Sequence, residues 1–110
     1  MIARLWHGAV PADKAAAYPQ YLQATGIADL QSTSGNKGVY VLRNIEDDVA
    51  HFVLISIWES LDSIRALAGD EIERARYYPE DSDYLLELEP AVTHYEVLTA
   101  PADLGGAEAS

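Results

Sequence analysis

Residues 49–58, Val-Ala-His-Phe-Val-Leu-Ile-Ser-Ile-Trp, form the most strongly apolar stretch of the 110-residue chain. Because the stretch is rich in β-branched and aromatic residues, it predicts a β-strand. Large apolar side chains stand at both odd and even positions, which is typical of a central strand covered on both faces. Residues 39–45 precede it across the acidic turn Glu46-Asp47-Asp48, so the two segments predict an antiparallel hairpin.

The chain before this hairpin predicts one strand and one helix. Residues 2–9 are dense in apolar and aromatic side chains and predict the first strand. The alanine-rich run from Pro11 to Thr25 favours a helix that kinks or restarts near Pro19, because proline lacks a backbone donor. Gly26 is the expected end of that helix, and residues 31–38 predict a loop rich in serine and glycine.

The chain after the hairpin predicts a second helix and a last strand. Ser60 is a suitable N-cap for a helix over residues 61–68, whose apolar side chains recur at helical spacing. Residues 72–77 predict a further helical turn or two before Pro79. Residues 91–98 favour extended structure and predict the final strand.

This order, β-α-β-β-α-β, predicts an α+β fold of the ferredoxin-like split βαβ type, with an antiparallel sheet and both helices on one face. The domain is expected to span residues 1–98, with a flexible tail over residues 99–110. The second sheet face would also be apolar, so we predict a homodimer through the sheet faces that closes a dimeric α+β barrel.

Composition excludes several classes of partner. Seven basic residues oppose 18 acidic ones, a net charge of −11, which disfavours binding to nucleic acid or to an anionic membrane. Residues 77–110 hold eight acids and no base, a pattern most often found on a solvated face. The chain has no cysteine, and it shows neither a signal sequence nor a membrane span, so a cytoplasmic location is expected.

The strand at residues 52–57 runs into Trp58-Glu59-Ser60 and a helix, and residues 92–98 form the closing strand. In both segments the chain resembles the antibiotic biosynthesis monooxygenase family of dimeric α+β barrels. The resemblance implies the ferredoxin-like dimer. It leaves the chemistry open, since the family includes oxygenases, haem-degrading enzymes and isomerase-like members.

Within that family, the haem-degrading members bind iron through a histidine late in the second helix and distort the porphyrin with a tryptophan before it. By spacing from Trp58, the corresponding positions here fall near Arg76 and Leu67. Arginine cannot be an axial ligand, so the resemblance disfavours haem degradation in this chain.

Four residues are candidates for a site. His7, in the first strand, is the candidate catalytic base; it stands near the asparagine of the haem-degrading members. Trp58, Arg76 and Tyr77 are candidates for substrate binding, because a cavity wall and an anion-holding group are needed. Structural roles compete with each assignment: His7 as a bonded core residue, Trp58 as a packing anchor, and Arg76 as a cation at a helix end.

No metal and no cofactor are predicted. A zinc site of His7, His51 and His94 is conceivable because the three lie on neighbouring strands, but their heights along those strands differ. Trp6 has the opposite parity to His7 and is expected at the dimer interface.

These observations favour a cofactor-independent monooxygenase-like protein that acts on a small aromatic or polyketide-type substrate. The alternative is a non-catalytic dimeric barrel that binds a hydrophobic small molecule or serves as an assembly module. A polar group in an apolar cavity favours the first, whereas a cavity lined by apolar groups alone favours the second.

Overall fold

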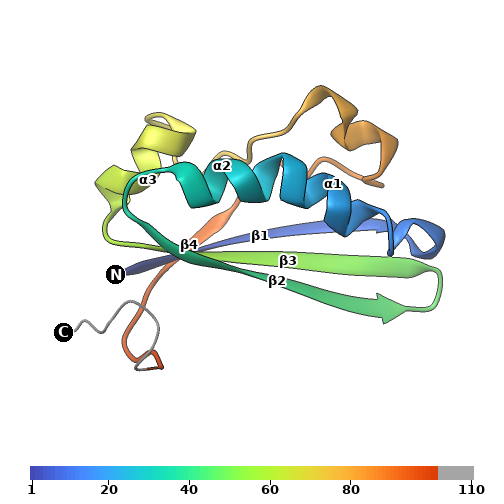
Figure 1. Ribbon diagram of the computed structural model, residues 1–110, viewed down its shortest axis with the longest axis horizontal. Helices are drawn as coiled ribbons and strands as arrows, with labels where there is room; N and C mark the ends of the chain where they lie inside the picture. The colour runs from blue at the N-terminus through green and yellow to red at the C-terminus, as the bar shows by residue number, and fades with distance from the viewer. Residues whose placement is uncertain (102–110) are drawn as a thin grey trace.

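The computed structural model describes residues 1–101 and contains one antiparallel sheet covered on one face (Figure 1). The strands are β1 (Ile2–Pro11), β2 (Asn36–Glu46), β3 (Val49–Trp58) and β4 (Thr93–Glu96), in the order β2-β3-β1-β4. The predicted α+β ferredoxin-like fold is confirmed, with the strand at residues 49–58 inside the sheet as expected. The predicted tail lies mostly outside the described residues.

Helices cover only one side of the sheet. They are α1 (Tyr18–Ala24), α2 (Gly26–Ser32) and α3 (Leu61–Ala68), and the irregular chain after α3 lies over the same side (Figure 1). Two short 3-10 turns, η1 (Ala12–Lys14) and η2 (Pro79–Asp83), complete the elements. No helix in the described part of the chain is long and apolar enough to cross a membrane.

Strand register fixes which side chains face the helices. Arg4 pairs with Ser56, Trp6 with Leu54 and Gly8 with Phe52, and the β3 members of these pairs are buried under the helices. Odd-numbered residues of β1 and β3 therefore lie on the helix-free face. The core divides into a cluster around Tyr18 and Phe52 and a second around Trp58 and Ile64.

Local sequence explains most helix boundaries. Ser60 caps α3, since its Oγ accepts the Ser63 N–H at 3.3 Å, and Gly69 ends the helix with a φ of 80°. Pro19 lies in the first turn of α1, so the predicted restart near this residue is confirmed. The helix ends next to the expected stop at Gly26, since α1 has Thr25 as its C-cap, but the chain begins α2 at once, with the Asp29 N–H bonded to the Thr25 carbonyl.

Three other segments differ from the prediction. The loop is short, because α2 runs to Ser32 and β2 already begins at Asn36. The last strand is limited to Thr93–Glu96. Of the helical turn or two expected at residues 72–77, one turn is present, closed by the Arg74 N–H on the Glu71 carbonyl. The helix goes no further because the backbone pairs with a distant segment: the Ala75 N–H bonds the Pro90 carbonyl, and the Val92 N–H bonds the Glu73 carbonyl.

Candidate functional site

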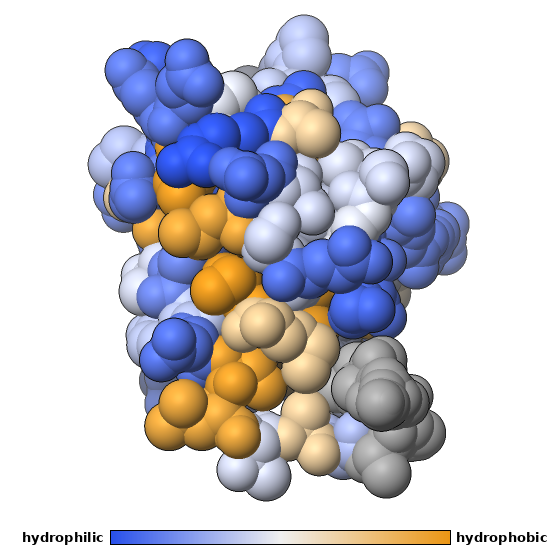
Figure 2. Space-filling model, turned by 90° about the vertical axis from the view of Figure 1, so that its left-hand side faces the viewer, coloured by the Kyte–Doolittle hydropathy of each residue, from blue (hydrophilic) through white to orange (hydrophobic). Residues whose placement is uncertain are grey.

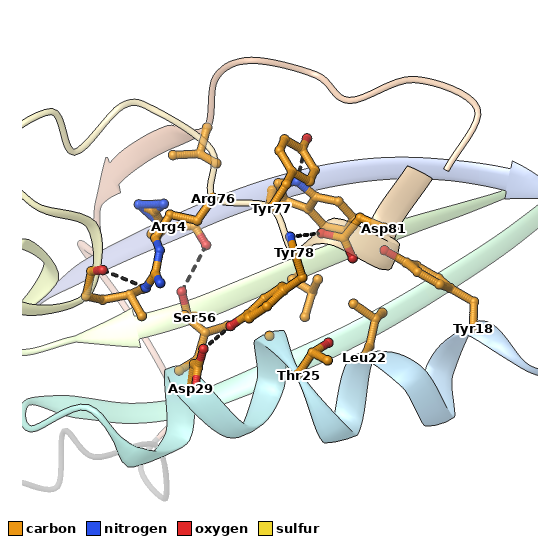
Figure 3. A pocket seen from close by; sticks show the side chains of 16 residues that line it. Arg4, Tyr18, Leu22, Thr25, Asp29, Ser56, Arg76, Tyr77, Tyr78 and Asp81 are labelled. Atoms are coloured by element: carbon orange, nitrogen blue, oxygen red, sulfur yellow. Dashed lines mark hydrogen bonds between the residues drawn. The ribbon is translucent and has the colours of Figure 1, made fainter. Parts of the chain in front are cut away.

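A cavity of about 90 Å³, partly open to solvent, lies between the sheet and the layer above it (Figure 3). Strands β1 and β3 form its floor, helices α1 and α2 one wall, and residues 76–81 another. Its polar lining includes Arg4, Asp29, Ser56, Arg76, Tyr77 and Asp81, and its apolar lining includes Trp6, Tyr18, Leu22 and Leu54.

Arg4 is a buried cation in the floor of this cavity. It is 6% exposed, and its guanidinium donates to the carbonyls of Ile72 at 3.0 Å and Arg74 at 3.3 Å. Among residues 1–101 no carboxylate lies within 4 Å of it. Burial, together with nearby Arg76, lowers the pKa of Arg4 to about 10, so the group is charged at neutral pH.

Arg76 lies at the exposed side of the cavity, as one of its lining residues. It stands in the irregular chain after α3, whereas the sequence predicted it at the end of a helix. Even so, its guanidinium donates to the Leu67 carbonyl in the last turn of α3 at 2.7 Å, so it satisfies one of the free carbonyls there. Among residues 1–101 the other N–H groups of this guanidinium have no hydrogen-bond partner, so a ligand can bond them.

Tyr77 and Trp6 lie side by side in the cavity wall. The Trp6 indole donates to the Tyr77 hydroxyl at 3.1 Å, and that hydroxyl donates to the Glu89 carbonyl at 2.6 Å. Burial raises the pKa of Tyr77, so its hydroxyl stays protonated at neutral pH. Gly8 makes room for the indole, because a Cβ there would lie 2.3 Å from the Trp6 ring.

Asp81 is the second buried charged group of the cavity. It is 5% exposed, and its Oδ2 accepts the Tyr78 N–H at 2.6 Å at the start of η2. Burial raises the pKa of this carboxyl. In Figure 3 the side chains of Asp81 and Arg4 lie toward opposite ends of the cavity.

Sequence reasoning missed both of these charged groups. Asp81 belongs to the acidic C-terminal third, which predicted a solvated face. The signal that could have found it is Pro79 in the first turn with Asp81 two residues later, a pattern typical of a helix start. For Arg4, the signal was a lone cation within an apolar strand.

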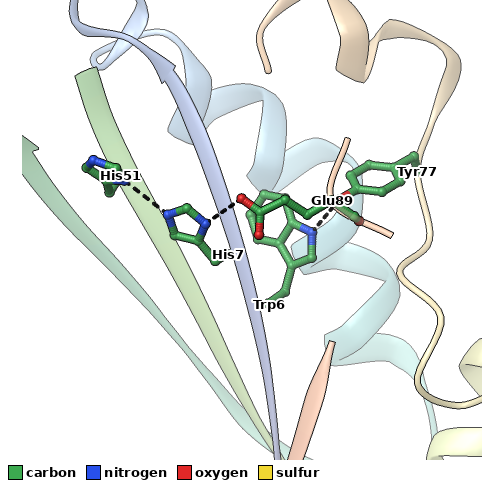
Figure 4. A network of polar contacts seen from close by, with 5 residues as sticks. All are labelled: Trp6, His7, His51, Tyr77 and Glu89. Carbon is green, nitrogen blue, oxygen red and sulfur yellow. Dashed lines mark hydrogen bonds and ion pairs between the residues drawn. The ribbon is translucent and has the colours of Figure 1, made fainter. Parts of the chain in front are cut away.

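The structure places the candidate base His7 outside the cavity. This residue pairs with Val53 across β1 and β3, so its side chain lies on the helix-free face of the sheet and not in the cavity. His7 Nδ1 lies 2.7 Å from Glu89 Oε2, and His7 Nε2 lies 3.0 Å from His51 Nδ1 (Figure 4). A ring-centroid separation of 5.3 Å at this N–N distance means that the two imidazoles meet end to end.

Trp58, Trp6 and His94 also differ from expectation. Trp58 is fully buried, packs against Ile64 and donates to the Ser56 hydroxyl at 2.9 Å, so it supports the sheet and does not line the cavity. Trp6, expected at a dimer interface, faces the helices instead. His94 pairs with Arg4 and lies on the face opposite His7, so the three histidines cannot share a metal ion.

Comparison with protein-family models gives no match, and comparison with curated protein sequences gives none either. Among solved structures, the chain is similar to a mutant of MhuD, described as carrying two manganese protoporphyrin IX molecules per active site. The TM-score is 0.57 at 15% identity, over 92% of this chain and 98% of the MhuD chain. The two proteins therefore share a fold.

Proposed function

We propose that the cavity binds a small anionic aromatic or polyketide-type molecule and that the protein oxidises it as a cofactor-independent monooxygenase. The observation that carries the proposal is Arg4, a guanidinium that is buried in the cavity floor without a carboxylate partner among the described residues. Burying an unpaired charge is costly, and an anionic ligand would supply the missing partner.

The cavity offers a ligand two kinds of contact, with charged side chains and with apolar ones. Arg4 and Arg76 hold the anionic oxygen, and Trp6 and Leu54 contact the ring and keep water away from it. A substrate anion is itself the electron donor to oxygen. For a ring methylene the balanced reaction is R₂CH₂ + O₂ → R₂C=O + H₂O, in which carbon is oxidised and dioxygen reduced.

A porphyrin does not fit this cavity. The MhuD mutant binds manganese protoporphyrin IX, a four-ring macrocycle, whereas the cavity here measures about 90 Å³ and takes about one aromatic ring. A polyketide-type ligand of two or three rings already needs displacement of the surrounding chain. No histidine, cysteine or methionine of the described chain lines it. By spacing from Trp58, Arg76 and Leu67 fall near the positions of the iron-binding histidine and the tryptophan of the haem-degrading members. We therefore assign no haem chemistry to this site.

We also propose that the protein is a homodimer in which the helix-free sheet faces of two copies pack together. Leu5 and Val53 lie on this face by register, next to the exposed Tyr40, Leu42 and Tyr95. In the end-on view of Figure 2, apolar residues gather in a band that reaches the lower side of the molecule, away from the helices. A second copy would cover this face, as the fold order predicts.

Ligand binding tests the role of Arg4. Trp6 lines the cavity, so its fluorescence reports binding of a panel of aromatic carboxylates, phenols, quinols and anthrones, and a Trp6→Phe variant identifies the signal. Replacing Arg4 or Arg76 by methionine should weaken binding of the anionic members about tenfold or more, since a hydrogen bond to a charged group contributes about 1.5–3 kcal/mol. Arg4→Lys keeps the charge, and Arg65→Met is the matched control on the exposed side of α3.

Oxygen uptake separates the enzyme from the non-catalytic barrel. We expect uptake with those panel members that the protein binds, and its loss in Arg4→Met. Binding without any uptake would favour the binding module, whereas equal affinity of the wild type and the folded Arg4→Met variant would overturn the proposed site.

A further inference from the structure

Two buried groups of opposite charge face the same cavity without pairing with each other. Arg4 is 6% exposed and Asp81 is 5% exposed, and the two lie toward opposite ends of the cavity in Figure 3. Among residues 1–101, no cation lies within 4 Å of the Asp81 carboxylate. A ligand that satisfies both groups must present an anionic oxygen at one end and an acidic proton at the other.

We propose that Asp81 is the proton acceptor of the cavity and that its ligand is a phenol conjugated with a carbonyl group that points toward Arg4. This inference rests on the proposed function and names the substrate class of that site. The acceptor is thus in the wall opposite the guanidinium, on η2, and not on β1 where the sequence predicted a base.

The proposed step moves one proton and no electrons between the ligand and the protein. The phenolic O–H bond breaks, its proton forms an O–H bond with the Asp81 carboxylate, and the ligand becomes a phenolate. Conjugation carries part of the negative charge to the carbonyl oxygen, where the Arg4 guanidinium stabilises it. In a substrate that also carries the ring methylene of the proposed reaction, this anion is the electron-rich form that gives electrons to dioxygen.

Two groups lie against the Asp81 carboxylate. Its Oδ2 accepts the Tyr78 N–H, and the Tyr21 hydroxyl lowers its pKa, but burial is the larger effect and leaves the pKa raised. The raised pKa of the buried carboxyl makes it a stronger base than a carboxylate on the surface. Tyr77 cannot replace it as a base, because its own pKa is raised and its hydroxyl stays protonated.

Asp81→Asn tests the inference, because asparagine keeps an oxygen for the Tyr78 N–H but takes up no proton. The probe is 4-hydroxybenzaldehyde, a one-ring phenol conjugated with a carbonyl, whose phenolate absorbs at longer wavelength than its neutral form. At a pH where the free probe is mostly neutral, wild-type protein should bind it as the phenolate. Asp83→Asn, at an exposed carboxylate of η2, is the matched control and should behave as the wild type.

The expected result is that Asp81→Asn still quenches Trp6 fluorescence with the probe while the ionised fraction of bound probe falls at least about tenfold, equivalent to one pKa unit. Equal ionisation in both proteins overturns the role of Asp81 and leaves the proposed function standing. Binding of benzoate but not of the phenol overturns the substrate class alone. No binding of any aromatic anion by the wild type overturns the proposed function itself.

Discussion

The positive charge of Arg4 affects its neighbour on β4 as well as the cavity. Its partner across β1 and β4 is His94, whose Nε2 is buried without a hydrogen-bond partner in the described structure. Burial lowers the pKa of His94, and the positive charge of Arg4 acts in the same direction, while Glu73 opposes it. At neutral pH the imidazole is therefore uncharged. In acid, its protonation would place a positive charge next to the Arg4 guanidinium.

The lowered pKa of His94 predicts that the protein loses stability in mild acid. In the unfolded chain the imidazole takes up a proton as pH falls below about 6.5, whereas in the folded protein it does so only at lower pH. Because the unfolded state then binds more protons, the free energy of unfolding should fall as pH decreases below about 6.5. His94→Gln should remove part of this slope in melting-temperature measurements, and His51→Gln is the control at a half-exposed histidine. An unchanged slope in His94→Gln would contradict the assignment.

At the scale of elements, local signals predict local structure. The strand at 49–58, the Ser60 cap and the restart at Pro19 all depend on residues within one or two turns, and the structure confirms them. The chain from 70 to 92 escaped prediction because its backbone groups bond partners far away in sequence. Arg74 pairs with Ala91, and such non-local pairing leaves no periodic pattern to detect.

That chain contains a segment, the strap (residues 84–92), that is tied to both faces of β1. The Leu86 N–H bonds the Ala9 carbonyl at 2.8 Å along the strand edge. Glu89 contacts His7 on the helix-free face through its carboxylate, and its carbonyl accepts the Tyr77 hydroxyl on the cavity side (Figure 4). Because the cavity is small, a ligand larger than about one ring needs displacement of the chain around it.

We therefore expect Glu89→Ala to loosen the strap. Glu89 and His7 are each about one-third exposed, so solvent screens their contact, and we assign it about 1 kcal/mol. Amide exchange at Leu86 should accelerate about fivefold in the variant, and aromatic ligands of two rings should associate faster. Glu87→Ala, at the exposed carboxylate two residues earlier, should change neither rate. Unaltered exchange at Leu86 in Glu89→Ala would show that the histidine contact does not hold the strap.

At the scale of the whole molecule, the sequence predicts the layers of the fold but not which strand face meets the helices. Odd and even residues of β1 and β3 are both apolar, so alternation alone does not distinguish the two faces. The face of His7 was therefore left open, and the expected face of Trp6 was wrong. Arg76 and Tyr77 line the cavity, and their role in substrate binding stays a prediction. On the even face Gly8 leaves room for the Trp6 ring and for Leu85, and Phe52, Leu54 and Ser56 of β3 are buried there.

The apolar character of the other face leads to the prediction that two copies join there. Leu42 and Tyr95 are 46% and 54% exposed in one chain, and neither belongs to a core cluster. Sedimentation velocity at micromolar concentration should give a species of about 24 kDa, twice the 12.0 kDa of one chain. Leu42→Glu places a charge within the joined faces and should weaken association about tenfold or more, because a buried unpaired carboxylate is costly. Leu61→Glu, on α3 at a similarly exposed leucine, should leave the dimer intact. A 12 kDa wild type under these conditions would overturn the proposed homodimer.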